Sequence, residues 1–123
     1  MLTETHTILP AADLQRFRGF YHDKLGLDPA EERQDGMLVY GTGPSAFEVY
    51  ETENAGTAKN TQMEWRTDDL DAEMRRMRDA GIVFEEFEIP GMKTENGVVT
   101  GDGMKTAWFR DSEGNILAIT QAM

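Results

Sequence analysis

His-Thr-Ile-Leu-Pro-Ala-Ala-Asp-Leu at residues 6–14 has a counterpart in Gln-Met-Glu-Trp-Arg-Thr-Asp-Asp-Leu at residues 62–70. In both stretches a polar ring or amide side chain opens a short strand-like segment, and an Asp-Leu pair follows seven residues later. The offset between the two copies is 56 residues for both features. Because a repeat at fixed spacing means one supersecondary unit built twice, this pattern sets the architecture.

A helical pattern follows each Asp-Leu pair. Apolar side chains recur there every three or four residues, at Leu14, Phe17, Phe20 and Tyr21 in the first copy and at Leu70, Met74 and Met77 in the second. Asp13 in the first copy and Asp69 or Asp68 in the second lie at the expected N-cap positions of these helices, where a carboxylate accepts a backbone N–H. Gly26 and Gly81 lie where a left-handed C-cap residue is expected.

Strand-sized segments come after each helix. We expect them near residues 28–33, 36–41 and 45–51 in the first half, and near 82–88, 105–110 and 115–120 in the second. The Gly-rich stretch 90–104 reads as a lid or a mobile loop. The order βαβββ, present twice, predicts one α+β domain over residues 1–123. Module 1 covers about 3–52, a linker covers about 53–60, and module 2 covers about 61–121.

Strand alternation leaves one face of the predicted sheet unusually polar. His6, Glu48, Tyr50, Gln62, Glu64 and Arg66 fall on this face, opposite an apolar set that would pack under the helices. Such a face is either a cup that holds a ligand or a solvated sheet surface, and periodicity alone leaves both open. We expect Tyr40, Tyr50 and Trp108 near the same face, which favours a cup.

The amino-acid composition excludes several classes of binding partner and cofactor. Twelve Lys and Arg against twenty-three Asp and Glu give a net charge of −11, which disfavours nucleic acid and anionic membranes. The chain has no Cys, so it forms no disulfide and no Cys-ligated zinc site. Its apolar runs are too short to span a bilayer, and its first ten residues lack the features of an export signal. These features predict a cytoplasmic location.

Taken together, the two His/Gln…Asp-Leu copies, the Phe20-Tyr21-x-x-x-Leu25-Gly26-Leu27 helix ending and the Asp111-Ser112-Glu113-Gly114-Asn115 turn resemble the vicinal oxygen chelate superfamily. This group contains glyoxalases, bleomycin-resistance proteins and extradiol dioxygenases. The resemblance covers residues 3–121. It implies two βαβββ modules that form a curved, cup-shaped mixed sheet with the helices on its outer face.

The resemblance also implies a divalent metal held by four side chains in catalytic members. Carried over to this chain, the positions fall on His6, Glu48, Gln62 and Ala118, and the last of these is normally Glu. Three ligands with one neutral amide would hold Zn, Ni, Mn or Fe only weakly, so we expect no tightly bound cofactor. The change at Ala118 argues against glyoxalase I and extradiol dioxygenase activity.

These observations predict a small-molecule-binding protein with an incomplete metal site, whose ligand is cationic or aromatic. The ligand-binding residues would be His6, Tyr40, Glu48, Tyr50, Gln62, Glu64 and Trp108. A first alternative is a metal-dependent lyase or isomerase that uses His6, Glu48 and Gln62. A second is an interaction domain with a vestigial cup, in which His6 and Glu48 would pair with each other. We also expect a homodimer, because pairing covers an exposed sheet edge.

Overall fold

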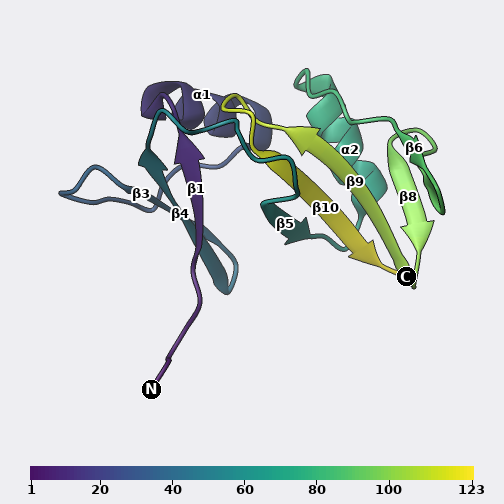
Figure 1. Ribbon diagram of the computed structural model, residues 1–123, viewed down its shortest axis with the longest axis horizontal. Coiled ribbons are helices and arrows are strands. Elements are labelled where there is room, and N and C mark those ends of the chain that lie inside the picture. Colours follow the sequence, from purple (N-terminus) through teal and green to yellow (C-terminus); the bar gives the residue numbers. More distant parts are fainter. The chain divides into compact units, whose positions relative to one another are not determined.

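The computed structural model describes residues 1–123 and groups them into two units, shown as ribbons in Figure 1. The first unit consists of Met1–Ala58 together with Asp111–Asn115. The second consists of Lys59–Arg110 together with Ile116–Met123. Neither helix has the length and apolar composition that crossing a membrane would require.

The first unit is a helix packed on one face of a four-stranded sheet. Its elements are β1 (Thr7–Ala11), α1 (Leu14–Leu25), β2 (Glu31–Glu32), β3 (Leu38–Thr42) and β4 (Ser45–Glu51). The strands lie in the order β1-β4-β3-β2, with β1 parallel to β4 and the other pairs antiparallel. This is the βαβββ order that the sequence predicts.

The second unit repeats this plan with an added two-stranded ribbon. Its elements are β5 (Met63–Arg66), α2 (Leu70–Asp79), β6 (Glu88–Ile89), β7 (Met92–Lys93), β8 (Val98–Gly101), β9 (Met104–Arg110) and β10 (Ile116–Ala122). The sheet order is β5-β10-β9-β8, with β5 parallel to β10, and β6 pairs with β7. The α+β class with two βαβββ modules is thereby confirmed.

Both N-caps and the glycine C-cap of α1 form as predicted, whereas α2 has the right-handed Ala80 as its C-cap, with Gly81 at positive φ after it. The Asp13 side chain accepts from the backbone N–H of Arg16, and the Asp69 side chain accepts from that of Ala72, both at 3.0 Å. Each bond satisfies a donor that the first helical turn leaves without an intrahelical partner. Helix α1 ends at Gly26, whose φ of +68° is the left-handed conformation that glycine adopts without steric cost.

Each unit has its own aromatic core between helix and sheet. In the first, the rings of Phe17 and Tyr21 stack at a centroid distance of 3.9 Å, and those of Tyr40 and Phe47 stack at 5.0 Å. In the second, Phe109 contacts Trp65 and Phe84 at 6.3 and 5.9 Å. Aromatic pairs of this kind add stability beyond the area that they bury.

The region between α2 and β9 differs from the prediction. The expected strand at 82–88 forms only its last residue, within β6, because its backbone bonds to β9 at one point, Glu85 N to Trp108 O at 2.8 Å. The strand that pairs with β9 is instead β8, inside the stretch 90–104 that reads as a lid or mobile loop. Turns at Asn96-Gly97 and Asp102-Gly103, all four residues with positive φ, bound this strand.

The turn Asp111–Asn115, between β9 and β10, belongs to the first unit and holds the start of α1. The buried Glu113 carboxylate accepts from the backbone N–H groups of Ala12 and Asp13, each at 3.0 Å, and from the Arg16 guanidinium at 2.9 Å. These bonds outweigh the desolvation of the carboxylate and lower the pKa of Glu113 to about 2.

Two more contacts fix this turn. The Tyr21 hydroxyl donates to Asp111 Oδ2 at 2.7 Å, and Asn115 Nδ2 donates to the backbone oxygen of Pro10 at 3.0 Å. Burial raises the pKa of Asp111, although its hydrogen bonds act in the opposite direction. The turn motif of the sequence is therefore a buried polar anchor for α1.

Candidate functional site

The face of the first sheet that lies away from α1 carries three of the predicted site residues. Strand β1 pairs with β4 so that Ile8 lies beside Glu48, and Pro10 lies beside Tyr50. Because alternate residues share a face, His6, Glu48 and Tyr50 lie together on this side, whereas Leu9 and Val49 are buried under the helix. We call this side the open face of the first unit.

Glu48 is the centre of an ion cluster on this face. His6 Nδ1 lies 3.0 Å from Glu48 Oε2, and Arg33 Nη1 donates to Glu48 Oε1 at 2.9 Å. The Glu48 residue is only 8% exposed, so the Arg33 charge and the two hydrogen bonds compensate a carboxylate that has lost most of its water. Sequence reasoning missed Arg33, because it lies in the irregular segment after β2, where alternation gives no signal.

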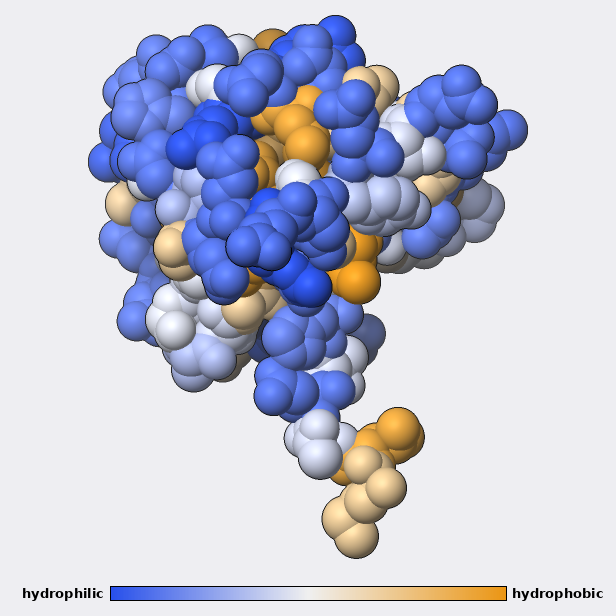
Figure 2. Space-filling model, turned by 90° about the vertical axis from the view of Figure 1, so that its left-hand side faces the viewer, coloured by the Kyte–Doolittle hydropathy of each residue, from blue (hydrophilic) through white to orange (hydrophobic).

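The N-terminal arm supplies a further partner. Residues before β1 have no regular secondary structure and project from a largely hydrophilic face of the molecule, ending in the exposed Met1 and Leu2 (Figure 2). Glu4 of this arm contacts His6 Nε2. The hydrogen bond and charge of Glu4, and then those of Glu48, raise the pKa of His6.

Tyr40 does not join this cluster, and the prediction that it shares the face of Glu48 is wrong. Strand β3 pairs Tyr40 with Phe47 and Val39 with Glu48, which turns the Tyr40 ring towards α1. The residue is 1% exposed and packs among aromatic rings. Its hydroxyl has no hydrogen-bond partner, and burial raises the pKa of Tyr40 to about 12.

The second unit has a corresponding open face with different chemistry. Gln62 Oε1 accepts from the backbone N–H of Ile116 at 2.9 Å, so this amide oxygen is bound to its own sheet. Glu64 accepts from the Thr120 hydroxyl at 2.7 Å and from Arg66 Nε at 3.0 Å. Thr120 in turn contacts the Thr106 hydroxyl at 3.0 Å. Sequence reasoning missed both threonines, which are neither charged nor aromatic.

Trp108 lies on this open face and lines a hollow. The hollow has a volume of about 230 Å³, and its lining residues are Glu85, Glu86, Phe87, Trp108, Arg110 and Ile116. The indole N–H of Trp108 donates to Thr61 Oγ1 at 3.0 Å, and the Phe87 ring meets the indole edge-on at 5.5 Å. The sequence suggests a solvated strand edge around Phe87, and its proximity to Trp108 is visible only in the structure.

Strand register shows which positions of the two units correspond. Ile8 pairs with Glu48 in the first unit, and Glu64 pairs with Ala118 in the second. Ile8 and Glu64, the residues on β1 and β5, are 56 positions apart in sequence, as His6 and Gln62 are. Glu48 and Ala118, the residues on β4 and β10, are 70 positions apart. Ala118 is therefore the structural counterpart of Glu48. A methyl group stands in the second unit where the first has a carboxylate.

The residues at the metal-ligand positions do not fit a bound metal ion. Both oxygens of Glu48 are already in contact with other side chains, His6 and Arg33, and the Arg33 guanidinium repels a second cation. The oxygen of Gln62 is bound to backbone, and Ala118 has no donor atom. No group of three or more His, Asp or Glu side chains is arranged to hold a metal.

Comparison with known proteins places this fold. Residues 5–119 match the family model described as the Glyoxalase/Bleomycin resistance protein/Dioxygenase superfamily. The chain belongs to this superfamily. Its membership agrees with the resemblance that the repeated motifs carry. Among curated proteins, none matches the sequence.

Solved structures with the same fold have different functions. The antibiotic-binding protein TnmS3 from a Streptomyces species superposes with a TM-score of 0.64 at 19% identity, covering 100% of this chain and 99% of that chain. Lactoylglutathione lyase from Agrobacterium tumefaciens gives 0.69 at 17% identity, covering 97% and 92%. A variant of the fosfomycin resistance protein FosX from Listeria monocytogenes, bound to Mn(II), gives 0.66 at 11% identity, covering 97% and 90%. At these identities the likeness establishes the fold alone.

Proposed function

We propose that this member of the superfamily binds a small molecule without a metal, and that its ligand is a planar aromatic cation. The observation that carries the proposal is the hollow beside Trp108, which combines an oriented indole, a second aromatic ring and two carboxylates. Aromatic faces attract cations through the ring quadrupole and stack on flat rings.

The geometry of the hollow supports a flat ligand. Trp108 lies directly across the strand pair from Ala118, so the small alanine leaves space beside the indole. The hydrogen bond to Thr61 fixes the indole plane before any ligand arrives, which lowers the entropy cost of binding. Phe87 is held in turn by Thr94, whose hydroxyl accepts from the Phe87 N–H at 2.9 Å.

The charge of the hollow supports a cationic ligand. Glu85 pairs with Arg110 at 3.0 Å, and the Glu86 carboxylate has a neutral partner, the Thr94 hydroxyl at 2.9 Å. One negative charge is therefore left without a cationic partner. The net charge of −11 also favours the approach of cations to the chain as a whole.

The ion cluster of the first unit supports a metal-independent function. The Glu48 carboxylate is occupied by His6 and Arg33, and the family's fourth position is Ala118. Among the structural neighbours, TnmS3 is described as an antibiotic-binding protein. Ligand contacts remain a prediction for five further residues: His6, Glu48 and Tyr50 on the open face of the first unit, and Gln62 and Glu64 on that of the second.

Metal content separates this function from the metal-dependent lyase or isomerase with His6, Glu48 and Gln62 as ligands. We expect untagged protein, purified without chelator and dialysed, to contain no stoichiometric Zn, Ni, Mn or Fe by plasma mass spectrometry. Near-stoichiometric metal would establish the lyase or isomerase site and overturn the proposal. The His6–Glu48 pair is also what a vestigial interaction domain would have, so a ligand must be demonstrated directly.

Three tricyclic probes test the ligand class: proflavine (cationic), phenazine (neutral) and anthracene-9-carboxylate (anionic). We expect affinity to fall in that order in calorimetric titrations. Trp108→Ala should weaken proflavine binding by about tenfold, the scale of a desolvated cation–π contact. Trp108→Phe, which keeps a ring but loses the bond to Thr61, should fall between the wild type and Trp108→Ala.

Thermal melting of each variant checks that the fold is intact. Equal binding of all three probes, or unchanged binding by folded Trp108→Ala, would contradict the proposed site. Failure of every probe to bind would favour the interaction domain with a vestigial site.

A further inference from the structure

The helix α2 carries two arginines whose charge no carboxylate neutralises by contact. Six of the eight arginines in the chain lie within 4.0 Å of a carboxylate oxygen: Arg16, Arg18, Arg33, Arg66, Arg76 and Arg110. The other two are Arg75 and Arg78. In a chain with almost twice as many acidic as basic residues, two unpaired arginines on neighbouring turns of one helix are an exception.

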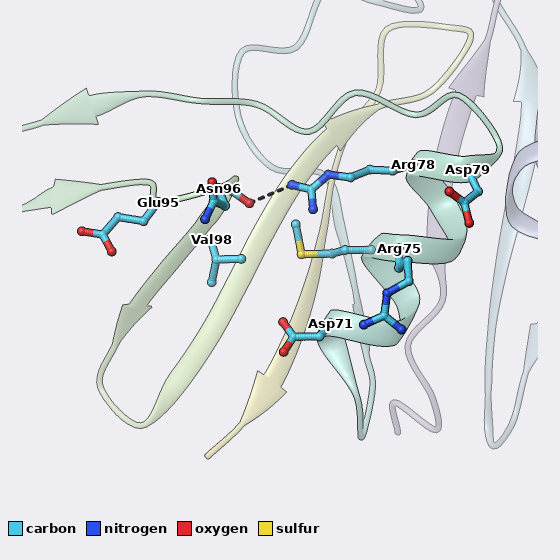
Figure 3. A pocket seen from close by; sticks show the side chains of 8 residues that line it. Asp71, Arg75, Arg78, Asp79, Glu95, Asn96 and Val98 are labelled. Carbon is cyan, nitrogen blue, oxygen red and sulfur yellow. Dashed lines mark hydrogen bonds between the residues drawn. The ribbon is translucent and has the colours of Figure 1, made fainter.

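Both arginines line one cavity, which is separate from the hollow at Trp108. The cavity has a volume of about 500 Å³ and lies between α2 and the segment that leads into β8 (Figure 3). Val98 lines it from β8, where it pairs with Ala107 and so faces away from the side of Trp108. Met74 supplies a second apolar surface from α2.

Arg78 is fixed in position. Its Nη2 donates to the backbone oxygen of Asn96 at 2.8 Å, and its guanidinium lies 5.2 Å from the centre of the Phe84 ring. Figure 3 shows the side chain reaching from α2 across to Asn96. A backbone oxygen and an aromatic ring orient the guanidinium but leave its full charge in place.

Arg75 differs, because it has no hydrogen bond or ion pair of its own and is exposed. It lies three residues before Arg78, and residues at this spacing are neighbours on a helix surface. Its long side chain can therefore join Arg78 around a common partner. Three carboxylates border the same cavity, those of Asp71, Asp79 and Glu95, and they disfavour a partner with more than one negative charge.

We propose that this cavity binds a small organic monocarboxylate with an apolar body. A guanidinium matches a carboxylate by two parallel hydrogen bonds, which suits the two arginines. Val98 provides most of the apolar surface for a hydrocarbon chain, and the edge of the otherwise buried Met74 adds to it. The three bordering carboxylates repel a doubly charged anion such as phosphate more strongly than a monocarboxylate, because the repulsion grows with the charge of the ligand.

Hexanoate is the probe, with hexanamide as its uncharged match and inorganic phosphate as the competing anion. Methyl spectra of ¹³C-labelled methionines report on Met74, and amide spectra report on Asn96 and Val98. We expect hexanoate to shift these signals in a saturable way, whereas hexanamide and phosphate do not. Arg75→Gln should weaken hexanoate binding by about tenfold, the effect of losing one charge-assisted hydrogen bond.

Arg76→Gln is the matched control, because Arg76 is next in sequence but pairs with Glu73 at 2.6 Å and does not line the cavity. This variant should bind hexanoate like the wild type. Equal shifts with hexanoate and hexanamide, stronger binding of phosphate, equal losses in the two variants, or no saturable shift at all would each overturn the proposal. Because Trp108 is on the other face of the sheet, none of these outcomes bears on the proposed function.

Discussion

The two units share a strand register but carry different chemistry on their open faces. In the first, Val39 and Glu48 lie opposite each other on β3 and β4, and in the second the same two positions hold Trp108 and Ala118. A carboxylate beside a small side chain in one unit thus becomes an aromatic ring beside a methyl group in the other. The strand register is the same in both units, and the side chains decide which unit carries an ion-paired carboxylate and which presents an aromatic ring.

The helix starts differ in a similar way. The two residues before α1, Ala12 and Asp13, donate their backbone N–H groups to the buried Glu113 carboxylate. The first residue of α2, Leu70, instead donates its N–H to the neutral amide oxygen of Gln121 at 2.8 Å. A charged acceptor forms stronger bonds than a neutral one and interacts favourably with the helix dipole. The comparison predicts that the two units depend to very different degrees on these single side chains.

The largest expected effect comes from truncating these two acceptors. Glu113→Ala removes a carboxylate that binds Arg16, Ser112 and two backbone N–H groups, and should lower the free energy of unfolding by about 3 kcal/mol. Gln121→Ala removes one neutral bond and should cost about 1 kcal/mol. Urea denaturation measures both. Equal losses would show that the charge of Glu113 contributes nothing beyond a neutral acceptor.

Acid should reveal the same asymmetry. The pKa of Glu113 is lowered from 4.5 to about 2, so its contribution to stability is complete above pH 4.5 and is lost as the pH falls towards 2. Asp111 has the opposite sign, because a raised pKa makes its protonation favour the folded state. We expect Glu113→Gln to flatten the stability curve over this range. If the stability of Glu113→Gln fell with pH as steeply as that of the wild type, Glu113 would not be the group responsible for the loss of stability in acid.

Two buried tyrosines of the first unit, Tyr40 and Tyr21, differ in whether their hydroxyl groups form hydrogen bonds. The second unit has Phe109 where the first has Tyr40, since each pairs with the corresponding residue of the next strand. Tyr40→Phe removes a buried hydroxyl without a partner and should leave stability unchanged or raise it by up to about 1 kcal/mol. Tyr21→Phe removes one of the two donors to Asp111 Oδ2, the other being the Asn115 side chain, and should cost about 1–2 kcal/mol. Calorimetric melting would show both, and a loss in Tyr40→Phe would reveal a bond to its hydroxyl.

The smallest effect concerns His6, for which the second unit has the non-titrating Gln62. Its pKa is raised mainly by Glu4 and less by Glu48, so Glu4→Gln should lower the pKa more than Glu48→Gln does. The stabilisation that goes with this shift is present at low pH and disappears as the pH rises through the raised pKa. Imidazole NMR titration measures both variants, and the reverse order would contradict the contact with Glu4.

Light scattering tests the predicted homodimer, for which the mass should be about twice 13.9 kDa at micromolar concentration. The strands β1 and β5 each end the strand order of their sheets and carry the edges that pairing would cover. A mass near that of one chain would exclude a stable dimer.

Local signals in the sequence predict the repeat and the N-caps of both helices. Each depends on spacing along one segment, as with Asp13 and Asp69. Features that depend on pairing between segments were not predictable in the same way. The orientation of Tyr40 follows from the register of β3 on β4, and Arg33 and Phe87 reach their partners from irregular segments. Strand β8 was hidden by its flanking glycine turns.

The anchor at Glu113 also has a consequence in time. Helix α1 is complete once residue 25 has been synthesised, but the carboxylate that anchors its start, Glu113, comes 100 residues after Asp13 along the chain. Because synthesis proceeds from the N-terminus, the first unit leaves the ribosome without Tyr21's acceptor and without the partner of Arg16. The first unit is thus synthesised first, but its structure is completed only after the turn Asp111–Asn115 has been translated.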